Sequence, residues 1–150
     1  MTTPNPTAVA AIPAIATAFF HPIPLIPLSY TLGIIKFVKL VDKPITKKEL
    51  KRVTLQNYGN LVKAVIDISK KVFVIDAPLH SDEEAFLLSS GSKQSDLWGI
   101  NLYPDLDGED FIEFDSMINL RPNAGNLSRG VDDVKIRSLI REIVSQLVQA

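Results

Sequence analysis

The sequence predicts an α+β domain, a mostly antiparallel sheet with helices packed on one face, in the order β-α-β-β-α-β-β-α. Three observations predict it. Two pairs of β-branched and aromatic runs, within residues 61–76 and 98–120, are each interrupted by a turn segment, as in hairpins. Two Ser/Thr-x-x-Glu patterns mark helix starts. An apolar stripe with helical spacing follows the last part of the chain. The 150 residues suffice for one such domain with one core.

The first half of the domain begins with an apolar strand over residues 34–41. Thr46 and Glu49 then form a capping box, in which each side chain bonds an otherwise unpaired N–H group of the first helical turn. Gly59 predicts the end of this helix, because glycine readily adopts the left-handed conformation that follows a last turn. The hairpin of residues 61–76 comes next.

The second half consists of a helix, a hairpin and a last helix. Ser81 and Glu84 make a second capping box, which predicts a helix over residues 82–90. Residues 98–103 and 111–120 form the second hairpin around the loop 104–110. The last helix is predicted by an unbroken apolar stripe, which consists of Ile136, Leu139, Ile140, Ile143, Val144 and Leu147.

The first 33 residues form a leader outside the domain, which we expect to occupy residues 34–150. Residues 1–35 hold no charged side chain and six of the ten prolines. Proline interrupts every apolar run before it reaches the ~20 residues of a transmembrane helix, and the basic start of a signal peptide is missing. Three interpretations stay open: a disordered leader, a membrane-associated or processed segment, or a start codon assigned too far upstream.

The composition excludes several function classes. The chain has no cysteine, so it contains neither disulfides nor thiolate chemistry. The net charge of -1 gives no general attraction to nucleic acid, which makes a nucleic-acid binder the weakest hypothesis. Charge is uneven, however: residues 36–71 carry ten bases and three acids, whereas residues 72–120 carry one base and eleven acids. These segments either attract each other or each meets a partner of opposite charge.

His80 lies directly before the second capping box, in a stretch that also holds Asp82, Glu83 and Glu84. Helix capping and the helix dipole explain the three carboxylates without any function. The alternative is a catalytic or metal-binding role for His80 together with an acid.

A polar strand face is the stronger candidate site. Strict alternation along residues 111–121 places Glu113, Asp115, Asn119 and Arg121 on one face, and a hairpin register adds Asn101 with Tyr103. Glu113 and Asp115 are the candidate catalytic residues, as acid and base or as ligands of a divalent metal, with His80 assisting. The alternative is the hydrated outer face of a one-sided antiparallel sheet.

The segment Arg121–Gly130, which follows this strand, predicts anion binding. Arginine offers a bidentate fork to phosphate or carboxylate, and Gly and Asn let backbone N–H groups turn toward an anion. In this hypothesis Arg121 and Arg129 clamp the ligand, so they must face the same space. The expected hydrogen-bond partners of the ligand are Asn101, Asn119, Asn123, Asn126 and Ser128.

The blocks "SKQSDLWGINLYP" (92–104) and "FDSMINLRP" (114–122) are the most specific part of a resemblance that covers residues 34–148. In them the chain resembles a family of short bacterial and archaeal proteins that is known as a domain of unknown function. The resemblance implies the domain boundary and a cytoplasmic prokaryotic protein. It implies no activity, cofactor or catalytic residue.

Two function hypotheses follow. The first is a small cytoplasmic domain that binds an anionic, phosphate-containing ligand such as a nucleotide or phosphoester, with metal-dependent hydrolysis as a possible activity. The second is a non-enzymatic interaction module that forms a homo-oligomer through its charge asymmetry or an open sheet edge. The sequence names no cofactor for either.

Overall fold

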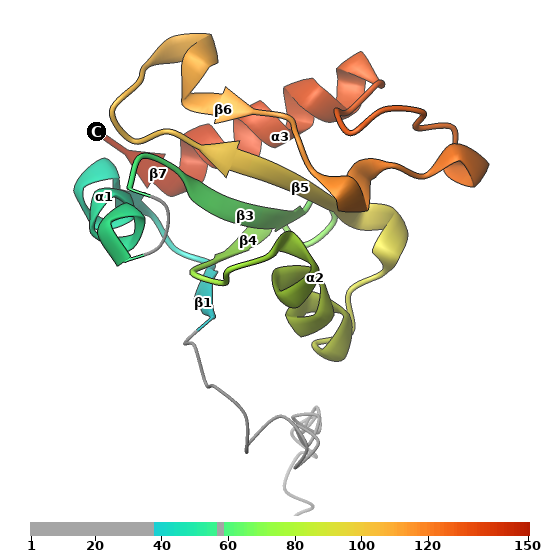
Figure 1. Ribbon diagram of the computed structural model, residues 1–150, viewed down its shortest axis with the longest axis horizontal. Coiled ribbons are helices and arrows are strands. Elements are labelled where there is room, and N and C mark those ends of the chain that lie inside the picture. The colour runs from blue at the N-terminus through green and yellow to red at the C-terminus, as the bar shows by residue number, and fades with distance from the viewer. Residues whose placement is uncertain (1–37, 57–58) are drawn as a thin grey trace, which may run out of the picture.

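The computed structural model describes residues 38–56 and 59–150; the leader predicted for residues 1–33 lies outside them. A five-stranded sheet with the order β1-β4-β3-β5-β6 forms the centre, and every neighbouring pair in it is antiparallel (Figure 1). The strands are β1 (Lys39–Val41), β3 (Val62–Asp67), β4 (Val72–Ile75), β5 (Leu97–Leu102) and β6 (Ile112–Glu113).

Three α-helices accompany the sheet: α1 (Lys47–Gln56), α2 (His80–Ser89) and α3 (Val134–Leu147). A separate two-stranded ribbon pairs β2 (Ile45–Thr46) in parallel with β7 (Val148–Gln149). Short 3-10 turns lie at Gln94–Asp96, Gly108–Phe111, Met117–Asn119 and Pro122–Ala124. The α+β class and the mostly antiparallel sheet are therefore confirmed, and no helix in the described part is long and apolar enough to cross a membrane.

The helices cover both faces of the sheet, whereas the sequence predicted one face. Ala64 and Ile66 of β3 point to the main core, which they share with α1 and α3. Val65 of β3 points the other way and packs with Leu87 of α2. Figure 1 shows α2 and α3 on opposite sides of the sheet. The physical reason lies in the two central strands, which are apolar at nearly every position, so that neither face can be left to solvent.

One of the two predicted capping boxes is present. The Thr46 N–H donates to Glu49 Oε2 at 2.8 Å, and the Glu49 N–H donates to Thr46 Oγ1 at 3.2 Å. The Ser81–Glu84 box is wrong, because α2 begins at His80 and its N-cap is Leu79, whose side chain makes no capping bond. The helix therefore turns Glu83 inward instead of leaving it in an exposed first turn.

The predicted strand 111–120 is also wrong beyond Glu113. β6 ends there, and the chain continues into the 3-10 turn Met117–Asn119. Asn119 explains the change: its Oδ1 accepts the Gly99 N–H at 2.8 Å and its Nδ2 donates to the Gly99 carbonyl at 2.9 Å. A single side-chain amide thus satisfies the backbone groups of β5 that a strand partner would otherwise pair.

Candidate functional site

A half-open hollow of about 210 Å³ lies beside the start of α2. Its polar lining comes from segments far apart in the sequence. It consists of Lys63 on β3, His80 and Ser81 on α2, Asn101 on β5, and Asp115, Ser116 and Arg129 on the loops after β6. The hollow therefore joins three predicted site residues, Asn101, Asp115 and Arg129, with the separately predicted His80.

Asp115 and Arg129 form a two-pronged ion pair at the hollow. Arg129 Nε lies 2.7 Å from Asp115 Oδ1, and an Arg129 terminal nitrogen donates to Asp115 Oδ2 at 3.0 Å. The backbone of Arg129 is held as well, since its carbonyl accepts from the Ser116 N–H and from Asn119 Nδ2. Arg129 is thus oriented before any ligand arrives.

His80 is fixed in one tautomer by the sheet. Its Nε2 lies 2.8 Å from the carbonyl oxygen of Ile100, and a carbonyl can only accept, so Nε2 carries the proton and Nδ1 the lone pair. Burial lowers the pKa of His80, which keeps the ring neutral near pH 7. A neutral, oriented imidazole is the form that accepts a proton or a hydrogen bond.

Glu83 lies one helical turn after His80 and is completely buried. Its Oε1 accepts the Ala77 N–H at 3.3 Å, and Oε2 has no partner among the described residues. Burial raises the pKa of Glu83 well above its ordinary value of 4.5. The sequence placed Glu83 in a first helical turn and did not predict its burial, although the spacing of His80, Glu83 and Leu87 on one helix face indicates it.

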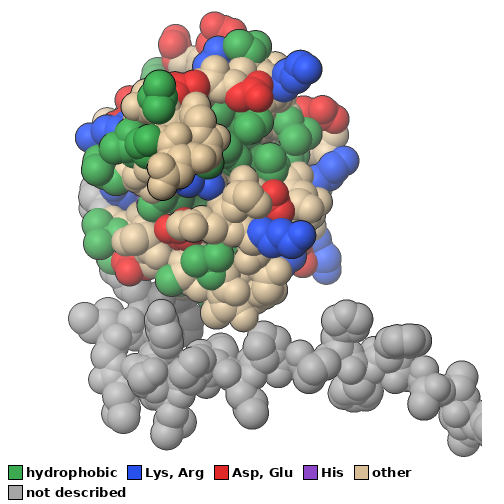
Figure 2. All heavy atoms as spheres, turned by 90° about the vertical axis from the view of Figure 1, so that its right-hand side faces the viewer, with side chains coloured by type: hydrophobic (Ala, Val, Ile, Leu, Met, Phe, Trp, Pro, Cys, Tyr) green, Lys and Arg blue, Asp and Glu red, His purple; other side chains and the backbone are tan. Residues whose placement is uncertain are grey.

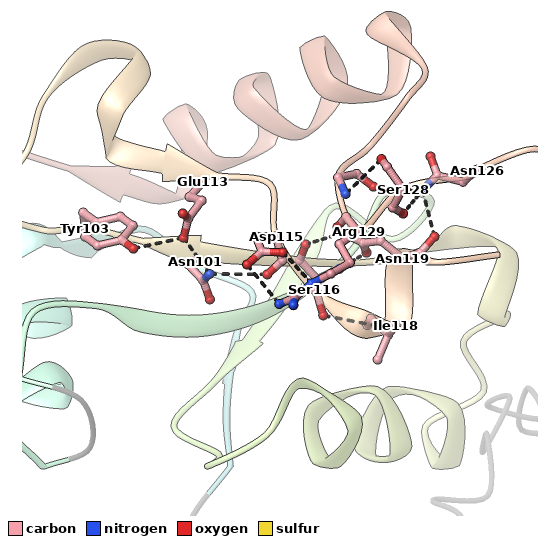
Figure 3. A network of polar contacts seen from close by, with 12 residues as sticks. Asn101, Tyr103, Glu113, Asp115, Ser116, Ile118, Asn119, Asn126, Ser128 and Arg129 are labelled. Atoms are coloured by element: carbon pink, nitrogen blue, oxygen red, sulfur yellow. Dashed lines mark hydrogen bonds and ion pairs between the residues drawn. The ribbon is translucent and has the colours of Figure 1, made fainter.

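Asn101, Tyr103 and Glu113 meet across β5 and β6, as the hairpin register predicted (Figure 3). Glu113 Oε2 accepts Asn101 Nδ2 at 2.8 Å and the Tyr103 hydroxyl at 2.9 Å. Burial, together with this bond to Glu113, raises the pKa of Tyr103. Glu113 is outside the lining of the hollow that Asp115 and His80 share, although it was predicted to act with them.

Asn119 and Asn126 are buried and serve the fold of the loop that carries Arg129. Asn126 Nδ2 donates to the carbonyls of Asn119, Ser128 and Gly130, and Asn126 Oδ1 accepts the Asp132 N–H at 2.8 Å. The Ser128 hydroxyl donates to Asp132 Oδ1. These three side chains were predicted ligand contacts, and the structure occupies all three with internal hydrogen bonds.

Arg121 does not join Arg129. Its guanidinium stacks on the ring of Trp98 at 4.1 Å from the ring centroid and donates to the carbonyls of Gln94 (2.6 Å) and Leu97 (2.9 Å). It lines a separate hollow, with Asn123. The structure thus gives Arg121 a role in fixing the loop before β5, and the predicted clamp of two arginines is not formed.

The unequal charges along the chain partly meet within the fold. Lys47 and Lys51 of the basic segment pair with Asp107 and Asp105 of the acidic loop between β5 and β6. Figure 2 shows acidic and basic side chains interspersed over the face that it presents. Within residues 38–56 and 59–150, no group of three or more His, Asp or Glu side chains is placed to hold a metal ion.

Comparison with known proteins gives one match. A family model described as a protein of unknown function matches residues 39–147. No curated protein and no solved structure matches the chain.

Proposed function

This chain belongs to the family DUF5674, whose description assigns no activity, and we propose from the geometry of the hollow that it binds a small anionic ligand there. The observation that carries the proposal is the guanidinium of Arg129, which Asp115 holds in a fixed orientation at the hollow. Lys63 and Arg129 are the cationic side chains of the lining, and His80 beside them is neutral.

Arg129 supplies the donors for this ligand. A guanidinium has five N–H donors, and Asp115 takes two of them, which leaves three for a phosphate or carboxylate. Because Asp115 already holds the side chain in place, binding costs little of the conformational entropy that a free arginine would lose.

The size of the hollow limits the ligand. Its volume of about 210 Å³ lies below the ~300–1,000 Å³ of pockets for drug-sized molecules. A phosphate, a small phosphoester or a small organic acid matches this volume better than a nucleotide. Such ligands are water-soluble metabolites, in keeping with the cytoplasmic location expected from the sequence.

The site favours binding over metal-dependent hydrolysis. The carboxylates of Glu113 and Asp115 are both engaged, the first by Asn101 and Tyr103 and the second by Arg129. Of the proposed catalytic residues, His80 keeps a basic nitrogen without the proton, so hydrolysis remains the secondary proposal with His80 as the general base.

Thermal unfolding of the full chain, dialysed against chelator, tests the proposal with orthophosphate, glycerol 2-phosphate and acetate. A ligand at ~100 times its Kd stabilises by about 2.7 kcal/mol, which corresponds to several degrees. We expect the shift to disappear in Arg129→Gln and to persist in Arg52→Gln, a control with the same charge change on an exposed residue of α1. Absence of any shift, or an equal shift in Arg129→Gln, contradicts the proposal. Repeating the series with Mg²⁺ or Mn²⁺, and assaying phosphate release, tests hydrolysis.

The alternative, a homo-oligomeric interaction module, is favoured by one observation. Leu79 and Met117 line the hollow and are 54% and 63% exposed, so that apolar surface lies directly beside the polar lining. A second copy could cover this surface. Light scattering at high protein concentration tests this alternative. A monomeric protein contradicts the interaction module. A dimer supports it if the Met117→Lys variant is monomeric.

A further inference from the structure

We propose that the bound anion also carries a hydrogen-bond donor, a hydroxyl or an amine. The side-chain oxygen of Asn101 accepts the hydrogen bond from this donor. This inference rests on the proposed function and names the ligand class for the same hollow. It excludes anions without a donor, such as acetate, as the preferred ligand. A small hydroxy acid, amino acid or hydroxylated phosphoester has the required chemistry.

The orientation of the Asn101 amide is fixed by its neighbours. One end of the amide faces Glu113 Oε2 at 2.8 Å and the carbonyl oxygen of Asp115 at 3.3 Å. Both are acceptors, so the nitrogen must lie on that side, and the oxygen must lie on the other. Figure 3 shows the Asn101 oxygen pointing away from Glu113.

That oxygen has no partner. Asn101 is 7% exposed, and its Oδ1 makes no hydrogen bond to any described residue. Buried polar atoms of proteins are almost always paired, so an unpaired acceptor in the lining of a hollow indicates a donor that comes from outside the chain. A carboxylate or a fully deprotonated phosphoester group cannot supply it, because its oxygens only accept, whereas orthophosphate near pH 7 still carries a P–OH donor.

Asp115 connects Asn101 with the arginine of the anion site. The backbone carbonyl of Asp115 accepts from Asn101, and the carboxylate of the same residue holds Arg129. Asn101 and Arg129 line the same small hollow, so one small ligand with an anionic group and a donor is proposed to contact both. The exposed Leu79 and Met117 can contact the remaining apolar part of such a ligand.

The ammonium group of Lys63 is a second group that could donate a hydrogen bond to Asn101 Oδ1. Lys63 lies opposite Asn101 in the register of β3 and β5 and lines the same hollow. If the ammonium group of Lys63 donates to Asn101 when an anion is bound, a hydroxyl on the ligand adds nothing. The two cases are separated by comparing ligands that differ only in the hydroxyl.

Isothermal titration of the full chain with two matched pairs makes this comparison: lactate against propionate, and propane-1,2-diol 1-phosphate against propyl phosphate. We expect the hydroxylated member of at least one pair to bind on the order of tenfold more tightly, the usual effect of satisfying a buried polar group. The ratio of affinities should fall to about one in Asn101→Ala. It should be unchanged in Tyr103→Phe, a control that removes the neighbouring bond to Glu113 but lies outside the hollow.

The ratio of affinities within each pair is measured first in the unaltered protein, so this result does not depend on whether Asn101→Ala folds. Equal affinities within both pairs overturn the inference and leave the anion site intact. A ratio that Tyr103→Phe abolishes as well overturns the assignment to Asn101. If neither these four compounds nor orthophosphate bind, the proposed function fails together with the inference.

Discussion

At the scale of single residues, two buried asparagines in the second half of the domain hold the backbone in place. Asn119 and Asn126 are buried and bond to backbone groups of β5 and of the loop before α3. The sequence suggested both as ligand contacts, because an asparagine in a Gly-rich segment is equally suited to a ligand or to a tight loop. Only the tertiary structure distinguishes these roles.

Replacing Asn119 by alanine should destabilise the fold strongly. Asn119→Ala removes three hydrogen bonds and leaves the Gly99 N–H and carbonyl unpaired in the interior, each at about 1–3 kcal/mol. We expect a total loss of about 3 kcal/mol in the free energy of urea unfolding. Asn123→Ala, at an exposed position of the same loop, should stay within about 0.5 kcal/mol. Similar losses for both would contradict the role of Asn119.

Glu83 should make the stability depend on pH. The pKa of Glu83 is raised in the folded state, so above pH ~4.5 the folded protein keeps a proton that the unfolded chain releases. Stability then falls by up to about 1.4 kcal/mol per pH unit as the pH rises toward the folded-state pKa. Glu83→Gln, which cannot ionise, should match the unaltered protein at pH 4 and exceed its stability at pH 8.

The control for this effect is Glu84→Gln on the same helix, whose carboxylate is only partly buried. The stability of this variant should equal that of the unaltered protein at pH 4 and at pH 8. Urea unfolding at pH 4, 6 and 8 measures all three proteins. If Glu83→Gln is no more stable than the unaltered protein at pH 8, Glu83 is not held uncharged.

At the scale of elements, the periodic pattern predicted the last helix well and the second hairpin only in part. The apolar stripe of α3 appears as predicted, with Ile140, Ile143, Val144 and Leu147 in the core. The alternation after Glu113 looked equally regular but did not form a strand. Alternation records only which residues are apolar, and it cannot show that Ser116 packs against the backbone of Gly99.

That close packing makes Gly99 a sensitive position. A Cβ atom there would lie 2.5 Å from Ser116 Cβ and Oγ, closer than atoms can approach without movement. Gly99→Ala should therefore cost about 1–3 kcal/mol, the usual effect of overpacking. Ser116→Gly in the same chain should recover part of the loss, which a double-mutant cycle of urea midpoints measures. Additive losses would show that the two positions do not touch.

At the scale of the whole molecule, the sequence indicated the fold class but not the placement of layers. The order of elements and the apolar strands were readable from local patterns. The position of α2 on the second face was not, because a helix so close in sequence to the sheet can pack on either side of it. The candidate site shares this limit, since Lys63, His80, Asn101 and Arg129 come together only through the tertiary fold.

The charge distribution also acts at this scale, by tying α1 to the loop between β5 and β6. Lys47→Gln with Lys51→Gln should lower the melting temperature by a degree or two at low salt, because exposed ion pairs contribute little. At 1 M salt the difference should vanish through screening. The pair Lys48→Gln with Arg52→Gln, on the same helix, removes the same charge. A salt-independent loss in the first pair alone would point to packing instead.

The single tryptophan of the chain also provides an internal optical probe. Trp98 is 6% exposed, stacks under Arg121, and points to the main core, whereas Asn101 on the same strand points to the opposite face. Its fluorescence should shift to longer wavelength when the protein unfolds and water reaches the indole. A ligand in the hollow, on the other side of the sheet, should leave the emission maximum unchanged. The wavelength of maximum emission thus reports whether the chain is folded, independently of whether a ligand is bound in the hollow.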